Sequence, residues 1–142
     1  MPVSLTKEEA HALLDSRPGW AVLTTIGKNG FPHSVPIGYF RLDDDIYLGG
    51  RSGTQRVRNI ERNAKVSLLV ESGKSMEDIK GLMIQGEASI VSNPDEVLPL
   101  MRAAAKQRGT SDDQLPAEPR PGVAYVRVRP SRYISWDYSR QE

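Results

Sequence analysis

Cysteine is absent from the 142-residue sequence, so neither a disulfide nor a thiolate metal site can form. Histidine occurs only at His11 and His33, which leaves too few nitrogen ligands for us to expect a metal site. An excess of one charge is also lacking, because 19 lysines and arginines face 18 acidic residues and the formal net charge is +1. Nonspecific nucleic-acid binding needs a strongly basic surface, so we expect no nucleic-acid partner.

Long hydrophobic runs are missing as well. No stretch approaches the roughly 18 apolar residues of a membrane helix, and the first residues lack the pattern of a signal peptide. These absences predict a soluble, cytoplasmic protein without a membrane partner. The length fits a single domain over residues 1–142, which is enough chain to bury a sizeable core.

The regular elements follow from turn residues and apolar patterning. Thr6 and Glu9 have the capping-box spacing and predict a helix that ends at Arg17. Further helices are predicted over 54–63 and 92–108, and strands over 20–26, 32–42, 46–49, 65–71, 82–91 and 123–136. This order, with hairpin spacing between strands, predicts a mainly β protein with helices (α+β), built as a small closed or half-closed β-barrel.

Three short features refine this prediction. Pro36 cannot donate a ladder hydrogen bond, which indicates an edge, a bulge or backbone exposed toward a ligand. Gly86 indicates a bulge or a close backbone approach. The aspartates 43–45 are interpreted as a hairpin turn, because they lack the glycine and distal glutamate of a calcium loop.

The chain is organised around residues 49–60, where a glycine-rich turn is predicted to lead from a strand into a helix. Thr54 is predicted to cap this helix by accepting a bond from a helical N–H. A helix N-terminus attracts anions, and Arg51, Arg56 and Arg58 add guanidinium groups that suit phosphate. We interpret the turn as a phosphate site. The alternative is an ordinary capped surface helix with solvated arginines.

Acid–base machinery is scarce by comparison. No nucleophile–base pair stands out, and His33 is interpreted as a polar surface residue at a hairpin. Catalytic residues therefore stay unassigned. A phosphate-holding turn on an apolar barrel suits a protein that binds a cofactor and lets the cofactor carry the reaction.

Residues 19–27, 30–39 and 49–59 together resemble the split β-barrel flavin/deazaflavin oxidoreductases related to pyridoxamine 5′-phosphate oxidase. The chain looks most like the deazaflavin-dependent branch, which uses coenzyme F420. The stretches 65–71, 82–91 and 135–137 extend the resemblance to roughly residues 3–138. No single motif is specific, but their order and spacing are.

The resemblance implies a homodimer with two cofactor sites at the subunit interface. Cofactor phosphate would meet Arg51, Thr54, Gln55 and Arg56. The ring would lie along the backbone of Ser34, Val35, Pro36, Ile37 and Gly38. Trp136 and Tyr138 would lie near the ring or the substrate, across the interface or within one chain, although Trp136 is equally well interpreted as a barrel-closing aromatic.

The sequence also departs from the family pattern. Arg56 replaces the usual lysine, which keeps the charge and favours bidentate phosphate contact. Gly53 stands where relatives carry larger or basic residues, and Gly38 where they often carry a bulky aromatic. The stacking of the ring and the shape of the substrate pocket are therefore open.

The implied function is hydride transfer from reduced deazaflavin to a small unsaturated or conjugated acceptor. Tyr39, Tyr138 or solvent would supply the accompanying proton. One alternative is an FMN-dependent oxidoreductase of the same fold, because the arginines suit an FMN phosphate equally well. The other is a non-catalytic carrier or small-molecule or haem-binding module, since fold does not fix function.

Overall fold

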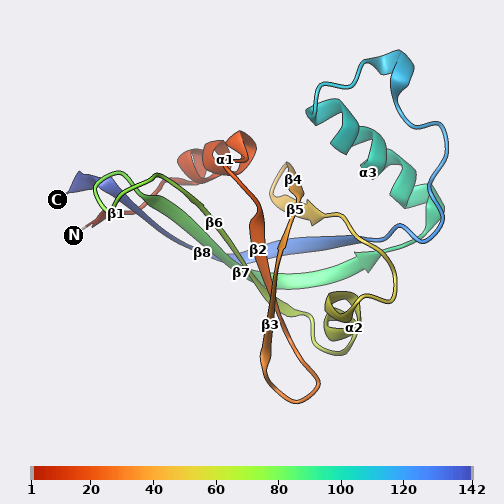
Figure 1. The fold of residues 1–142 in the computed structure, drawn as a ribbon, viewed down its shortest axis with the longest axis horizontal. Helices are drawn as coiled ribbons and strands as arrows, with labels where there is room; N and C mark the ends of the chain where they lie inside the picture. The colour runs from red at the N-terminus through yellow and green to blue at the C-terminus, as the bar shows by residue number, and fades with distance from the viewer. Residues whose placement is uncertain (1, 142) are drawn as a thin grey trace.

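The computed structural model describes residues 2–141 (Figure 1). Its helices are α1 (Lys7–Ser16), α2 (Gln55–Arg62) and α3 (Pro94–Gln107), with a short 3-10 helix at Asp112–Gln114. Its strands are β1 (Pro2–Val3), β2 (Ala21–Ile26), β3 (Pro32–Ile37), β4 (Tyr39–Leu42), β5 (Asp45–Leu48), β6 (Lys65–Ser72), β7 (Lys80–Val91) and β8 (Tyr125–Gln141).

The strands form one antiparallel sheet in the order β3-β2-β6-β7-β8-β5-β4, with β1 paired to β8. The two ends of this order, β3 and β4, are separated in the chain only by Gly38. The sheet therefore has to curl until its two edges meet at that glycine, which makes it a split barrel. The predicted fold class is confirmed.

Several boundaries differ from the prediction. The strand expected over 32–42 is broken at Gly38, because its first half pairs with β2 and its second half with β5, at opposite ends of the sheet. Asp45 pairs with Leu42, so the hairpin loop is two residues rather than three. The last strand runs on from Trp136 to Gln141, and the short strand β1, which the sequence did not reveal, pairs with it.

Other local predictions are confirmed. Thr6 and Glu9 form a complete capping box on α1. β3 is an edge strand, which accounts for Pro36. The β7–β8 register shifts at Gly86, and a Cβ there would collide with the carbonyl oxygen of Arg129, so this glycine marks both a bulge and a close approach.

Two apolar clusters hold the molecule together. The larger fills the barrel with alternate residues of the strands, such as Leu23, Leu68 and Ile84, and is covered by Leu14 of α1 and Ile60 of α2. The smaller lies beneath α3, where Met101 packs near Phe40 and Tyr125. Figure 1 shows α3 beyond one end of the long antiparallel pair β7–β8, whereas both termini lie at the other end.

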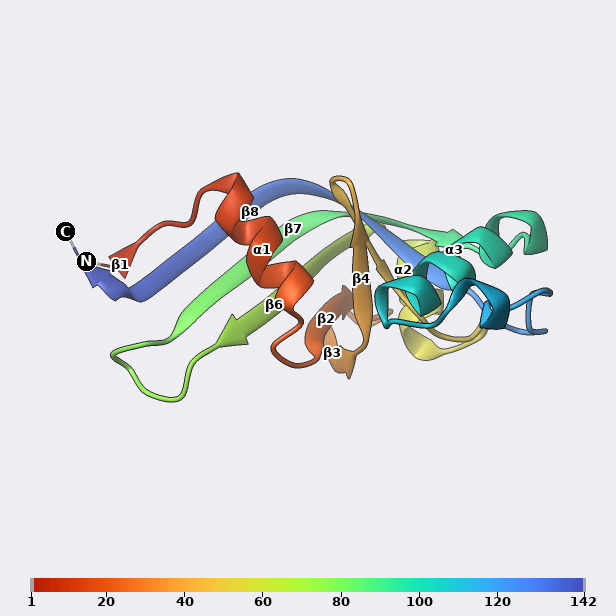
Figure 2. The same ribbon diagram turned by 90° about the horizontal axis from the view of Figure 1, so that it is seen from above.

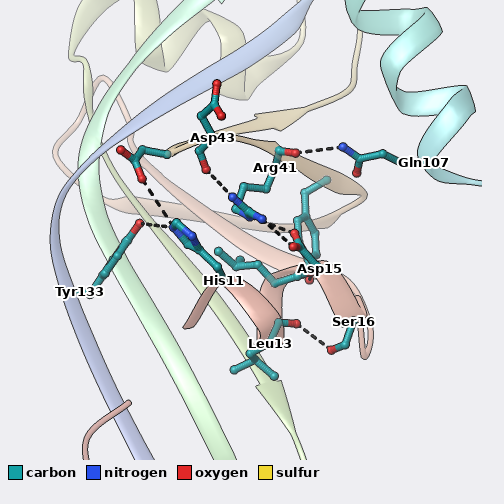
Figure 3. A network of polar contacts seen from close by, with 11 residues as sticks. His11, Leu13, Asp15, Ser16, Arg41, Asp43, Gln107 and Tyr133 are labelled. Carbon is teal, nitrogen blue, oxygen red and sulfur yellow. Dashed lines mark hydrogen bonds and ion pairs between the residues drawn. The ribbon is translucent and has the colours of Figure 1, made fainter. Parts of the chain in front are cut away.

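A polar network joins α1, β4 and α3 (Figure 3). Arg41 donates to both carboxylate oxygens of Asp15, at 2.9 and 2.6 Å. Its backbone carbonyl accepts a bond of 2.9 Å from the side chain of Gln107 on α3. His11, partly buried on α1, lies 3.5 Å from the hydroxyl of Tyr133. These contacts fix the ends of both helices against the barrel.

Figure 2 shows the molecule as an elongated body, with the β6–β7 loop at the same end as the termini. Among the three α-helices of residues 2–141, none is both long enough and apolar enough to cross a bilayer.

Candidate functional site

The turn between β5 and α2 is held rigidly from one side. Arg51 forms an isolated bridge with Val123, the amide of Ser52 donates to the carbonyl of Gly122 at 3.1 Å, and the amide of Ala124 donates to the carbonyl of Gly50 at 3.1 Å. Gly53 has a φ of +82°, a conformation that strains a side-chain-bearing residue, so the glycine suits this turn. The backbone of the turn is therefore preorganised.

Thr54 occupies the N-cap position of α2, as predicted, but the predicted capping bond is wrong. Its hydroxyl donates to the carbonyl of Arg51 at 3.1 Å, and no side chain caps the helix. The hydroxyl turns back because the tight turn presents that carbonyl to it. The first N–H groups of α2 thus receive no side-chain acceptor and can bond an anion.

Arg56 lies in the first turn of α2 and folds back over Gly50. A Cβ on Gly50 would stand 2.6 Å from one terminal nitrogen of Arg56, so a side chain at position 50 would force this guanidinium to move. The Nε of Arg56 is buried and has no hydrogen-bond partner among residues 2–141. Because a buried donor without a partner is unfavourable, this atom indicates a site that an external acceptor completes.

The other cations of the turn are placed differently. Arg51 is exposed, with a terminal nitrogen 3.8 Å from the position of a Cβ on Gly122. Arg58 is also exposed, whereas Arg56 is half-buried. The structure therefore distinguishes Arg56 from its neighbours, which the sequence could not do.

A buried polar network behind the turn was missed in the sequence. Asn59 of α2 is fully buried and donates to the hydroxyl of Thr25 on β2 at 2.9 Å. Its side-chain oxygen accepts bonds from Gln55 at 2.8 Å and Arg62 at 3.1 Å. Gln55 is therefore oriented from within the helix. The period-2 pattern of β2 does place Thr25 on the inner face with Leu23, so a signal was available.

The predicted ring platform, Ser34 to Gly38, lies along the open edge of the sheet. β3 pairs only with β2, so some of its backbone groups face away from the ladder. The side chains of Val35 and Ile37 turn into the barrel, whereas those of Ser34 and Pro36 turn outward. The hydroxyl of Ser34 lies 2.8 Å from that of Thr24. The strand thus offers backbone, rather than charged side chains, to a ligand.

Two pockets lie at the two ends of β3. The first, of about 650 Å³, brings Pro32 and His33 together with Gln55 and Asn59 of α2, and with the hairpin residues 27–29 and Phe31. His33 was expected to be an ordinary surface residue, but its Nδ1 is buried, and no group in the described part of the chain bonds to it. The structure thus brings the start of β3, just before the platform, to the first residues of α2.

The second pocket, of about 550 Å³, lies at the other end of β3, where Gly38 meets Gly49. The two glycines are neighbours because the adjacent residues Tyr39 and Leu48 are paired. Arg17, Trp20, Phe40, Arg108 and Tyr125 also line this pocket. The sequence did not indicate that these residues share a site.

Tyr39 is poorly placed to supply a proton. It is buried, its hydroxyl donates to the carbonyl of Leu14 at 3.0 Å, and burial raises its pKa to about 12. Tyr138 lies on β8, two residues beyond Trp136. The structure therefore disfavours Tyr39, whereas Tyr138 and solvent stay open among the three sources.

Trp136 is not brought to the turn of its own chain. It pairs with Gly81 and its indole covers that glycine, on the outer face of the β7–β8 pair. The start of β7 and the end of β8 lie on the side of the termini, away from α2 (Figure 1). Trp136 can meet the site of the turn only across an interface between subunits.

No group of three or more His, Cys, Asp or Glu side chains converges as a metal site within residues 2–141. The arrangement is instead suited to anions and to flat ligands. The rigid, basic turn between β5 and α2 leads into a helix whose N-terminus no side chain of the described residues caps. Beside it lies the open edge of β3, with a pocket at each end.

Comparison with known proteins supports this interpretation of the fold. The family model for pyridoxamine 5′-phosphate oxidase matches residues 6–137. A 5a,11a-dehydrotetracycline/5a,11a-dehydrooxytetracycline reductase of Streptomyces rimosus is 25% identical in an alignment of 125 positions, and the alignment covers 83% of this chain and 74% of that protein.

Solved structures agree in fold. A conserved hypothetical protein of Mycobacterium tuberculosis superposes with a TM-score of 0.83 at 24% identity, covering 96% of this chain and 87% of the other. An F420 reductase superposes with a TM-score of 0.67 at 21% identity, covering 87% and 94%. At these identities the likeness concerns the fold alone.

Proposed function

The chain belongs to the pyridoxamine 5′-phosphate oxidase family, and on this premise we propose that it is an oxidoreductase with a flavin-type cofactor. The cofactor's phosphate would bind at the turn before α2, and its ring would lie along β3. The observation that carries the proposal is the buried, unpartnered Nε of Arg56 beside an uncapped helix N-terminus. A phosphate would satisfy both at once.

The chain's own residues would act by binding and orienting. Arg56 and the first N–H groups of α2 would hold the phosphate, while Arg51 would add charge at the rim. Asn59 fixes Gln55 through a bond of 2.8 Å and so keeps one wall of the site in place. The bound cofactor would supply the hydride. The protein would contribute orientation and exclusion of water, which lower a barrier without a protein acid.

Within this class we propose coenzyme F420, with FMN as the alternative. A deazaflavin tail carries carboxylates in addition to phosphate, and Arg51, Arg56 and Arg58 offer more positive charge than one phosphate needs. FMN would use the same turn through its phosphate alone. The acceptor would be a small unsaturated or conjugated molecule. The Streptomyces rimosus relative, a reductase of 5a,11a-dehydrotetracycline, supports a reduction of this kind.

We further propose that the protein works as a homodimer. Five cross-strand neighbours form an apolar row on the outer face of the sheet: Pro36, Val22, Leu69, Met83 and Ile134. Leu69 is 37% exposed, although the outer face of an antiparallel sheet is normally polar. A second copy related by a twofold axis would cover this outer row with its own.

Such a dimer would also give Trp136 a role. The residue lies two positions beyond Ile134 on β8 and therefore faces the same side of the sheet. Packing of two outer rows would carry each Trp136 toward the partner subunit, where the resemblance implies a cofactor site. The dimer is thus proposed as part of the site.

A non-catalytic binder remains the second candidate, and the lack of a positioned acid–base pair favours it. Turnover separates the two. The protein is titrated with FMN, FAD and coenzyme F420 by fluorescence, and the reduced cofactor that binds is then offered conjugated acceptors. Acceleration of cofactor oxidation is expected. Binding without acceleration by any acceptor would support a carrier, and failure to bind all three cofactors would refute the proposal.

A further inference from the structure

The pocket where Gly38 meets Gly49 carries an unusual balance of charge. Its lining includes Arg17 and Arg108 but no carboxylate. Within residues 2–141, neither Arg17 nor Arg108 forms an ion pair. The arginines that do are Arg41, Arg127 and Arg140. An apolar cavity that holds two unneutralised guanidinium groups has a positive potential that attracts an anion.

The two arginines are brought together by long-range contacts. Arg17 ends α1 and donates to the main-chain carbonyl of Gln107 at 2.9 Å. The side chain of Gln107 in turn donates to the carbonyl of Arg41 (Figure 3). Arg108 follows Gln107 directly, so these bonds set both guanidinium-bearing residues at one pocket. The positions of Arg17 and Arg108 at this pocket are therefore fixed by hydrogen bonds between α1, α3 and β4.

The remaining wall is aromatic. Trp20 is 70% exposed, and its ring lies 3.5 Å from the position of a Cβ on Gly38. Phe40 and Tyr125 meet edge to face, with ring centroids 5.9 Å apart. Burial raises the pKa of Tyr125, so this phenol adds no negative charge at neutral pH. A large exposed indole beside a glycine leaves space for a flat ligand to stack.

A simpler explanation is that both arginines neutralise helix dipoles, because each stands at the C-terminal end of a helix. That role requires neither an exposed tryptophan nor a cavity between the two. A guanidinium also has five donors, and the bond to Gln107 uses one of those of Arg17. Donors are left over for a ligand.

We propose that this pocket binds a flat, conjugated group that carries a carboxylate or an equivalent anion. The ring would stack on Trp20 and the anion would meet Arg108 and Arg17. Gly38 also ends the proposed ring platform, so a ligand here would lie beside the cofactor. Its identification as the acceptor rests on the proposed function, whereas the preference for an anion does not.

The preference is tested on the protein without cofactor by calorimetric titration with 1-naphthoate and with neutral 1-naphthalenemethanol. One naphthoate per chain is expected, bound roughly tenfold or more tightly than the alcohol, as charged hydrogen bonds imply. Arg108→Gln should remove this preference. Lys106→Gln removes a charge from the same helix outside the pocket and should preserve it.

Circular dichroism shows whether both variants fold, which is expected because Arg108 and Lys106 are exposed. Equal affinity for the two ligands, absence of binding, or an equal loss in both variants would overturn the proposal. A purely hydrophobic pocket gives the first of these results.

The source of the anion is distinguished by preloading. If the pocket receives the carboxylates of the cofactor's own tail, coenzyme F420 should block naphthoate, and the deazaflavin without its tail should not. If the pocket receives the acceptor, naphthoate should still bind beside either cofactor. Should no cofactor bind, the proposed function fails while the anion preference of the pocket stands or falls on its own.

Discussion

Replacement of Arg56 by methionine separates a ligand-binding arginine from a structural one. The Nε of Arg56 is buried and unpartnered, and a buried donor without a partner costs roughly 1–3 kcal/mol. Arg56→Met removes that donor and keeps an unbranched side chain over Gly50. We therefore expect the free energy of unfolding of the cofactor-free protein to stay the same or to rise by up to about 1 kcal/mol.

Cofactor binding, by contrast, should become weaker in Arg56→Met. A hydrogen bond to a charged group contributes roughly 1.5–3 kcal/mol, so Arg56→Met should weaken binding by about ten- to a hundredfold. Dissociation constants are measured by fluorescence titration at low and moderate salt, and stability by urea unfolding. FMN is compared with riboflavin, which lacks the phosphate, and coenzyme F420 with its tail-less deazaflavin. The ligands without phosphate should bind equally to both proteins.

Arg58→Met is the matched control, because Arg58 lies on the same helix and is exposed. It should leave stability unchanged and affect binding less than Arg56→Met. Equal and small losses of affinity in the two variants would mean that the phosphate binds elsewhere. A clear loss of stability in Arg56→Met would show that the guanidinium serves the fold.

Three further outcomes are expected. Gly38→Val should fold, because a Cβ at this position meets only Trp20, at 3.5 Å. The added side chain should crowd the cofactor ring and weaken cofactor binding by roughly tenfold or more, as overpacking does. Unchanged affinity in the folded variant would refute the platform. Leu69→Glu should convert a dimer into a monomer by light scattering at micromolar concentration, and a monomeric parent protein would refute the dimer. Asp137 has a lowered pKa, chiefly because Ser139 donates to its carboxylate. Its contribution to the free energy of unfolding should be present above the ordinary carboxyl pKa and lost as pH falls through the lowered pKa of the folded protein. In urea unfolding, Asp137→Asn should reduce this acid dependence.

The elements of this fold were largely predictable because their signals are local. The capping box at Thr6, the cap and proline at Asn93 and Pro94, and the alternation in β2 and β6 depend on neighbouring residues alone. The break at Gly38 was not predictable in this way. It arises because the two halves of one apolar stretch pair with strands at opposite ends of the sheet.

The candidate site shows the same division. The position of Thr54 at the start of α2 could be predicted, but not the direction of its hydroxyl, which depends on a carbonyl three residues earlier. The burial of Arg56, in contrast to Arg58, depends on its packing over Gly50. The meeting of Arg17 with the end of α3 joins residues 90 positions apart, and no local pattern encodes it.

One long-range feature could nevertheless have been derived from the hairpin β4–β5. A two-residue loop at Asp43 and Asp44 pairs Leu42 with Asp45, and counting back along both strands pairs Tyr39 with Leu48. The residues next outward are Gly38 and Gly49. A loop of three aspartates shifts the register by one and places Gly38 opposite Gly50 instead. The two-residue loop thus determines that Gly38, the end of the ring platform, stands beside Gly49. Gly49 precedes Gly50, the glycine over which Arg56 folds. The register of one short hairpin therefore brings the proposed platform to the proposed phosphate site.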